Sequence, residues 1–301
     1  ALVAAENHMV FQPLLAEVAS ASVSPRHVVN PLRHMCRGIT VQKGLVKRID
    51  HERREVHISA GDFTPDVVLR YQRLVVTLGA VIDLSRVPGM TEHALLMQNV
   101  GDAMKLRSTI ISRFEEANLV LDREKRRSIL RFVVVGGGYS GVETAGEIHD
   151  LMTEIHRYYT NVDRDDFEVL LVHSRQRILP TLTAELGEFA RRKLEARGIK
   201  MVLGYRVEAV TAKSITLNDG TRLEASTVVS TIGNAPNPTV TRLAHDLQLT
   251  TERGRLAVNA SGRILCTDDL WAAGDCAAWP MPGKAGENCP ATAQFAQRQG
   301  T

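Results

Sequence analysis

RFVVVGGGYSG, residues 131–141, joins a run typical of a buried strand to a glycine-rich turn and then to a helix-forming segment. Gly136, Gly138 and Gly141 have the spacing GxGxxG, which between a strand and a helix is typical of a dinucleotide-binding loop. The first glycine permits the tight turn, the second lets the backbone approach a pyrophosphate, and the third lets the helix pack against the strand. Tyr139 and Ser140 stand in the first helical turn, whose unpaired amides bind phosphates. We therefore predict that these five residues hold a dinucleotide.

The next buried strand, predicted over 169–172, carries the second half of this fingerprint. An acidic residue after that strand usually holds the ribose 2′-hydroxyl, but this strand is followed by His173-Ser174-Arg175. The polar insert 158–167 explains why the strand ends 32 residues past the last glycine (173 − 141 = 32). Because His173 and Arg175 suit a 2′-phosphate, NADPH and NADH stay equal candidates. The alternative, that Arg175 is a solvated loop residue, also stays open.

Strand and helix patterns alternate through the middle of the chain. A helix predicted over 184–197 ends at Gly198, a typical C-cap, and an Asn218-Asp219-Gly220 turn closes a strand. We predict further strands over 41–46, 55–59, 74–78, 200–203, 214–217 and 228–232, and a helix over 102–121. We interpret the charged run 122–127 as a solvated connector. The alternation around the glycine loop predicts an α/β fold with a parallel sheet.

Length and composition limit the classes of protein to which the chain can belong. The 301 residues suit two domains, and 44% hydrophobic with 24% charged residues is ordinary for a globular chain. Lys+Arg 37 against Asp+Glu 34 gives +3, too balanced to indicate a nucleic-acid partner. No apolar run approaches the ~18 residues needed to span a bilayer. The four cysteines have no CxxC spacing, so we expect neither a dithiol centre nor a metal site.

Three further motifs resemble those of flavoproteins with two dinucleotide folds. Residues 270–278, LWAAGDCAA, resemble the second flavin-binding motif, which implies that Gly274 and Asp275 bind FAD. Residues 75–80 and 231–238 resemble the two junction motifs, which implies cofactor contacts for Thr77, Gly79 and Gly233. The resemblance therefore implies two Rossmann-like domains, with an NAD(P)H-binding domain inserted into a discontinuous FAD-binding domain. We expect FAD-domain parts at 1–127 and 239–301, around an NAD(P)H domain at 128–238.

Within that superfamily the chain resembles the type II NADH dehydrogenases, the single-subunit NADH:quinone oxidoreductases. The resemblance rests on FQPLL at 11–15, GVETAGE at 141–147 and AQFAQRQG at 293–300. It implies catalytic roles for Glu143, Glu147 and Gln294 and a flavin contact for Ala293. Two positions depart from the family pattern. The acid expected near Ala4 is absent, and Glu6 is either its substitute or a surface residue. Arg298 stands where the family often has Gln.

The resemblance also implies an enzyme that passes a hydride from NADH or NADPH to FAD and two electrons on to a quinone, without pumping protons. It implies a βα unit of about 30 residues before Ala1 and membrane-binding amphipathic helices after Thr301. We therefore expect a peripheral protein on the cytoplasmic face of a membrane, and a homodimer is a further expectation.

Two other functions stay open. One is a flavoprotein that reduces a soluble acceptor such as a ferredoxin, and the other is a non-enzymatic NAD(P)H sensor. The alternative for Glu143 and Glu147 is a purely structural role, because carboxylates near a helix N-terminus are stabilised by its dipole. Disulfide reductases of the superfamily are disfavoured, because no cysteine lies in 7–20 or directly after the glycine loop.

Overall fold

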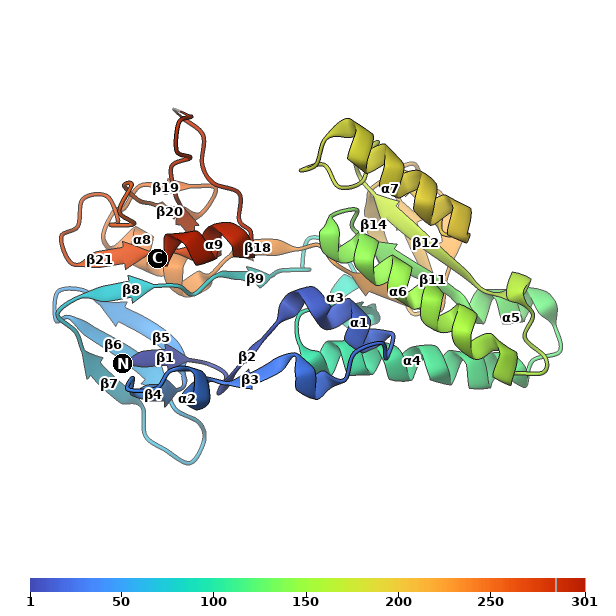
Figure 1. The fold of residues 1–301 in the computed structure, drawn as a ribbon, viewed down its shortest axis with the longest axis horizontal. Coiled ribbons are helices and arrows are strands. Elements are labelled where there is room, and N and C mark those ends of the chain that lie inside the picture. The colour runs from blue at the N-terminus through green and yellow to red at the C-terminus, as the bar shows by residue number, and fades with distance from the viewer. Residues whose placement is uncertain (285, 301) are drawn as a thin grey trace. The chain divides into compact units, whose positions relative to one another are not determined.

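The computed structural model describes residues 1–284 and 286–300. The chain forms two compact units, drawn as ribbons in Figure 1. Unit 1 comprises Ala1–Met9, Pro31–Asp83 and Asn234–Thr301, and unit 2 comprises Val10–Asn30 and Leu84–Gly233. No helix within residues 1–284 and 286–300 combines the length and apolar character that crossing a membrane requires.

Unit 2 is built on a five-stranded parallel sheet with the strand order β10-β17-β11-β12-β13. Its strands are β10 (Ala94–Leu96), β17 (Thr227–Ser230), β11 (Arg131–Val135), β12 (Glu168–His173) and β13 (Lys200–Leu203). Nearly every side chain of β11 and β12 is buried. That is why these strands are continuous apolar runs, as strands covered on both faces are. The predicted parallel α/β fold is confirmed for this segment.

Helices cover the sheet. α6 (Tyr139–Ile155) packs on β11 and β12, α7 (Ala184–Arg197) on β13, and α4 (Val100–Asn118) on β10. α4 begins at a capping box between Asn99 and Asp102. Its buried side chains recur every three or four residues, as a helix that faces a core requires: Ala103, Leu106, Ile110, Phe114 and Ala117. Thr183 is the N-cap of α7, and Gly198, with a φ of 102°, is the predicted left-handed C-cap.

One hydrophobic core holds unit 2 together. It includes α1 (Leu15–Ala19), α4, α6, β11 and β12, and Phe114 and Phe132 are its largest fully buried side chains. Segments 10–30 and 84–127 therefore belong to the same compact unit as the glycine loop. The predicted domain boundaries, after residues 127 and 238, differ from the boundaries of these compact units. The assignment of FAD and NAD(P)H to particular domains stays a prediction.

Smaller elements complete unit 2. An antiparallel sheet consists of β14 (Val207–Thr211), β15 (Ser214–Leu217) and β16 (Arg222–Glu224). The predicted turn after β15 is present, with Gly220 at φ 83°. Two short helices are α3 (Met90–His93) and α5 (Arg123–Ile129). β2 (His8–Val10) pairs with β3 (Val29–Pro31) where the chain passes between the units.

Unit 1 contains two separate parallel strand pairs, β1 (Leu2–Ala4) with β4 (Val41–Lys43) and β8 (Leu74–Val76) with β21 (Leu270–Ala272). An antiparallel sheet of β5 (Leu45–Asp50), β6 (Glu55–Ser59) and β7 (Val67–Arg70) lies in the same unit. The other elements are α2 (Leu32–Met35), β9 (Ala80–Ile82), β18 (Asn234–Pro236), α8 (Pro238–Asp246), β19 (Thr251–Glu252), β20 (Arg255–Ala257), β22 (Ala277–Ala278) and α9 (Ala293–Gln299). Its core includes Ile49, Val76, Leu256 and Leu270.

Two sequence predictions need correction. The charged run 122–127 is largely helical, because Asp122 caps α5 by accepting the amides of Glu124 and Lys125. Arg126 is buried there and pairs with Asp166 rather than with solvent. The helix predicted to reach residue 121 ends at Asn118, and Leu119 and Leu121 are exposed beyond it.

Candidate dinucleotide-binding site

The glycine loop connects the carboxyl end of β11 to α6, the place where ligands bind in open parallel sheets. Gly136 has a φ of 125°, and a Cβ there would lie 2.4 Å from Thr231 Oγ1. A Cβ on Gly141 would lie 1.8 Å from the carbonyl oxygen of Gly136. Only glycine fits either position, because a side chain would collide with fixed backbone or with a packed neighbour. With glycine at both positions, the first turn of α6 approaches the Gly136 backbone more closely than a side chain would allow.

Gly138 differs from these two glycines. It is exposed, its φ of −80° suits any residue, and a Cβ there would meet nothing within 4 Å. Neither folding strain nor crowding therefore explains a glycine at this position. A side chain would project into the open space before the first turn of α6, where no side chain caps the helix amides. The loop thus keeps a helix N-terminus bare, as anion binding requires.

His173 braces the loop from the end of β12. Its Nδ1 accepts a hydrogen bond from the Gly137 amide at 3.1 Å, and a Cβ on Gly137 would lie 2.6 Å from the imidazole Cγ. Burial, together with the neighbouring charge of Arg175, lowers the pKa of His173. The imidazole therefore stays neutral near pH 7, with its proton on Nε2. That nitrogen is buried and has no hydrogen-bond partner within the described residues.

Gly233 follows β17 at the same edge of the sheet and has a φ of 103°. Two residues earlier, Thr231 donates its hydroxyl to the carbonyl of Val135 at 3.0 Å. Unit 2 therefore groups Gly233 with the glycine loop and His173 at the carboxyl ends of adjacent strands.

Glu143 and Glu147 project from α6, one turn apart. Glu143 is exposed, and partial burial, with the charges of Glu17 and Glu147, raises its pKa. Glu147 accepts a hydrogen bond from the Ser20 hydroxyl near the end of α1. The sequence did not single out Ser20 or Glu17, because both lie more than 120 residues before Glu143 and only tertiary packing brings them to α6. Partial burial, and then these neighbouring carboxylates, make Glu143 retain a proton more readily than an isolated Glu.

The second set of predicted residues lies in unit 1. β21 runs parallel to β8, and both strands end at the same edge with Gly274 at φ 76° and Gly79 at φ 64°. Asp275 follows in a short helical turn and is half-buried. The Cys276 thiol donates to the carbonyl of Val76, and burial raises its pKa, so it acts as a packing group. Thr77, within the 75–80 motif, is exposed.

Helix α9 packs against the short helical turn that contains Gly274 and Asp275. Gln299 accepts the Gly274 amide through Oε1 at 2.8 Å, and both residues line a common pocket with Asp275. Ala293 and Gln294, singled out from the sequence, are exposed on the first turn of α9. Gln299 was not singled out. It belongs to the segment 293–300, but no spacing marks it, because its partner Gly274 lies 25 residues away.

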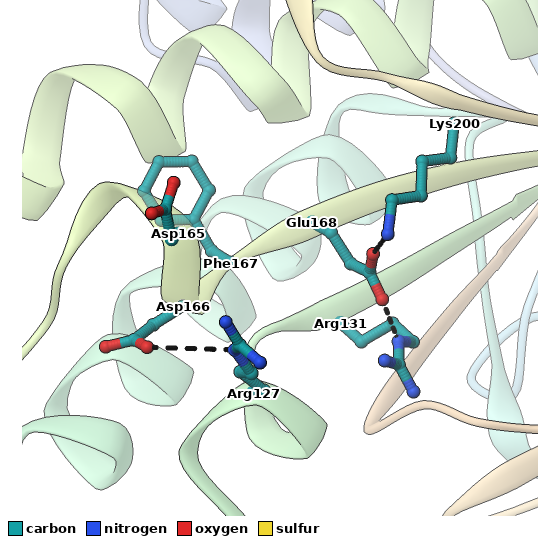
Figure 2. Close-up of a pocket in the computed structure, with 7 residues that line it drawn as sticks. All are labelled: Arg127, Arg131, Asp165, Asp166, Phe167, Glu168 and Lys200. Atoms are coloured by element: carbon teal, nitrogen blue, oxygen red, sulfur yellow. Dashed lines mark hydrogen bonds and ion pairs between the residues drawn. The ribbon is translucent and has the colours of Figure 1, made fainter. Parts of the chain in front are cut away.

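A pocket of about 180 Å³ lies at the opposite edge of the unit 2 sheet, at the amino ends of β11, β12 and β13 (Figure 2). Among the described residues, each charged side chain that lines it except Asp165 forms an ion pair. Glu168 pairs with both Arg131 and Lys200, and Asp166 pairs with Arg127 at 4.0 Å. We therefore interpret it as an ionic network that joins the strand starts. Among the described residues no group of three or more His, Cys, Asp or Glu is arranged to hold a metal.

The chain is similar to known proteins over nearly its whole length. The sequence model of the family described as pyridine nucleotide-disulphide oxidoreductase matches residues 1–300. The external alternative NADH-ubiquinone oxidoreductase of Yarrowia lipolytica mitochondria is 30% identical over 296 residues, covering 92% of this chain and 51% of the relative. The internal alternative NAD(P)H-ubiquinone oxidoreductase A1 of Arabidopsis thaliana mitochondria is 29% identical over 313 residues, covering 99% of this chain and 60% of the relative.

Among solved structures, NDH2 from Plasmodium falciparum in complex with NADH superimposes with a TM-score of 0.85. Sequence identity is 21%, over 92% of this chain and 59% of that one, so the likeness shows a shared fold. The chain thus spans between 51% and 60% of the length of these three proteins.

Proposed function

We propose that this chain, which belongs to the pyridine nucleotide-disulphide oxidoreductase family, is the dinucleotide-binding portion of an enzyme that oxidises NAD(P)H and reduces a quinone. The observation that carries the proposal is the contrast within the glycine loop. Gly136 and Gly141 are required by packing, whereas Gly138 is unconstrained by the fold and keeps the helix N-terminus open. A glycine that the fold does not need is explained by a ligand whose phosphates approach the backbone.

The quinone comes from the relatives, whose names give ubiquinone as the acceptor. Because the chain spans about half of the Yarrowia relative, quinone reduction is proposed for the whole protein rather than for these residues alone. Peripheral attachment to the cytoplasmic face of a membrane and a homodimeric state belong to the same proposal. The relatives are named as mitochondrial proteins.

The residues of unit 1 fit FAD. Asp275 is half-buried at the carboxyl end of a parallel strand pair, and within the described residues no donor binds its carboxylate. A carboxylate so placed accepts hydroxyl hydrogen bonds, and Gly79 and Gly274 leave the adjacent backbone free of side chains. When bound, FAD supplies two-electron chemistry, so that NAD(P)H, a proton and a quinone give NAD(P)+ and a quinol.

The residues of unit 2 position the donor. The bare amides of α6 bind the pyrophosphate, and His173 fixes the Gly137 amide on the other side of the turn. Glu143 follows the loop by two residues, and partial burial together with its acidic neighbours favours its protonated form. We assign it a proton-holding role beside the nicotinamide. Glu147, tied to Ser20, has the lesser role of orienting the start of α6.

The experiment compares two glycine variants of the complete protein. Gly138→Val adds a side chain in open space and is expected to leave folding intact while NADH and NADPH oxidation fall at least about a hundredfold. Gly146→Ala, farther along α6 and also free of contacts within 4 Å, is the matched control and keeps activity. A short-chain quinone and a ferredoxin are offered as acceptors. Reduction of ferredoxin alone would favour a soluble acceptor, and binding of NAD(P)H without flavin would favour a sensor.

A further inference from the structure

The predicted flavin contacts at this end of unit 1 come from two segments of the chain. Asp275 belongs to the short helical turn after β21, and Ala293 and Gln294 lie on the first turn of α9. The intervening chain folds back on itself, because the Cys289 amide donates to the carbonyl of Trp279 at 2.8 Å. The turn and the helix therefore pack against each other although they are separate in the sequence.

Arg255, on β20, holds both ends of this intervening chain. Its guanidinium donates to the carbonyl of Ala277 at 3.5 Å, directly after the turn, and to the carbonyl of Cys289 at 3.3 Å, shortly before α9. Residues of the turn and of α9 line one pocket together with Arg255. The loop therefore leaves the turn and approaches α9 at fixed points.

The turn itself begins on a residue that does not restrain its own backbone. Gly274 has a φ of 76°, a left-handed conformation that glycine adopts at little cost and leaves as easily. The residue before it is held, because the Ala273 amide donates to the carbonyl of Val76 at 3.1 Å. Asp275 directly follows Gly274, so a rotation at Gly274 would redirect its carboxylate. A ligand bound by that carboxylate would then lose affinity to the entropy of ordering it.

Gln299 provides a restraint at this point. From the last turn of α9 its Oε1 accepts the Gly274 amide at 2.8 Å. The helix packs closely there, since a Cβ added to Gly274 would lie 3.9 Å from the Cβ of Ala296. The bond fixes the direction of the Gly274 amide, and with it the start of the turn that carries Asp275. None of the described residues 293–299 is buried, so the bond also helps to hold α9 to unit 1.

From these contacts we propose that Gln299 is a positioning residue for the flavin, which restrains Gly274 so that Asp275 is ordered before FAD binds. The inference rests on the proposed function, because it assumes that Asp275 accepts hydroxyl groups of FAD. Gln299 acts in this role through its acceptor oxygen rather than through the size of its side chain. Without the acceptor, FAD must order Asp275 as it binds, which corresponds to about a fivefold loss of affinity.

The test compares the FAD affinity of the complete protein with that of three variants. Each protein is stripped of flavin, and the dissociation constant for FAD is measured by calorimetry. Gln299→Leu removes the acceptor at similar size and is expected to bind FAD about fivefold more weakly. Gln299→Glu keeps an acceptor oxygen and should bind FAD more tightly than Gln299→Leu does. Gln297→Leu, at an exposed position of the same helix, is the matched control and should leave the dissociation constant unchanged.

Melting temperatures separate positioning from a purely structural role. Weaker binding stabilises the folded state less, so Gln299→Leu should lower the melting temperature more in the presence of FAD than in its absence. An equal decrease with and without FAD would make the bond structural only and overturn the proposal. Because Gln299 acts through Asp275, Gln299→Leu should also weaken FAD binding less in the Asp275→Ala background. A full, additive loss in that background would contradict the proposal as well.

The outcomes distinguish this inference from the proposed function. If Gln299→Leu binds FAD as tightly as the unaltered protein while Asp275→Ala loses it, the positioning role is overturned and the flavin site stands. If the unaltered protein itself binds no FAD, the proposed function fails, and this inference fails with it.

Discussion

The imidazole Nδ1 of His173 accepts the backbone amide of Gly137 across two adjacent parallel strands, at 3.1 Å. A side chain at the end of one strand thereby sets the shape of a loop at the end of its neighbour. The bond requires a neutral ring, because a protonated imidazole has no acceptor. The loop that is proposed to bind phosphate therefore depends on one protonation state.

Coenzyme affinity should follow that protonation state. The pKa of His173 is lowered, chiefly by burial and then by Arg175, so the bond persists at pH 6.5 and above. As the pH falls through the folded-state pKa, the bond is lost and affinity is expected to drop about fivefold, the value of one hydrogen bond. Titration of coenzyme fluorescence between pH 5 and 8 measures this. A loss of affinity centred above pH 6.5 would contradict the assignment.

Folding stability should also depend on pH through His149. Burial, with the charges of Arg164 and Arg197, lowers its pKa to about 4 in the folded state. The unfolded chain has an ordinary pKa near 6.5, so it binds a proton that the folded chain rejects. The contribution of His149 to the free energy of unfolding is therefore fully present above pH 6.5. It falls by roughly 3 kcal/mol as the pH approaches 4. Urea titrations of the protein and of His149→Gln should diverge over that window, and parallel curves would refute the claim.

Asp166 should be a stability determinant. Its side chain is fully buried and accepts hydrogen bonds from Arg123 at 2.9 Å and Arg126 at 2.8 Å. Burial alone would raise its pKa, but these bonds and the Asp163 amide outweigh it and lower the pKa. Asp166→Ala would leave Arg126 buried and unpaired, at a cost of about 3–5 kcal/mol. Glu116→Ala breaks the exposed pair with Arg113 and should cost less than about 1 kcal/mol. Equal denaturation midpoints for the two variants would disprove the difference.

Flavin retention should depend on Asp275. Asp275→Ala removes the proposed acceptor for the FAD hydroxyls, so the purified protein is expected to lose most of its flavin while its far-UV circular dichroism is unchanged. The neighbouring Asp268 is fully exposed and provides the matched Asp→Ala control. The ratio of flavin absorbance to protein concentration reports the result. Full occupancy in Asp275→Ala would end the role assigned to this residue.

Local patterns predicted the parts of the fold that depend on local chemistry. The strand predicted over 214–217 and the helix predicted over 184–197, with Gly198 as its cap, match the structure. Both predictions rest on hydrophobic periodicity and capping, which depend only on residues close together in the sequence. The glycine loop was likewise visible, since its three positions lie within six residues. These features needed no knowledge of distant contacts.

Features that depend on tertiary packing were missed. The sequence alone favours a solvated connector for 122–127. Arg126 in this run is buried because it pairs with Asp166, which lies 40 residues farther along the chain. Ser20 reaches Glu147 across 127 residues, and Gln299 reaches Gly274 through an amide that only the fold exposes. Only the structure distinguishes Arg175 from Arg177, because identical side chains two residues apart differ in their carbonyl partners alone.

The isolated strand pairs of unit 1 have a practical consequence for handling the protein. β1 with β4 and β8 with β21 are two-stranded parallel sheets, and within the described chain neither pair is extended by a further strand. Such edges are templates for intermolecular pairing, and Val75 of β8 is 60% exposed beside one of them. A preparation limited to these 301 residues should therefore self-associate as its concentration rises, with light scattering and thioflavin fluorescence increasing together. Solubility, more than catalytic competence, would then govern how this preparation behaves in the test tube.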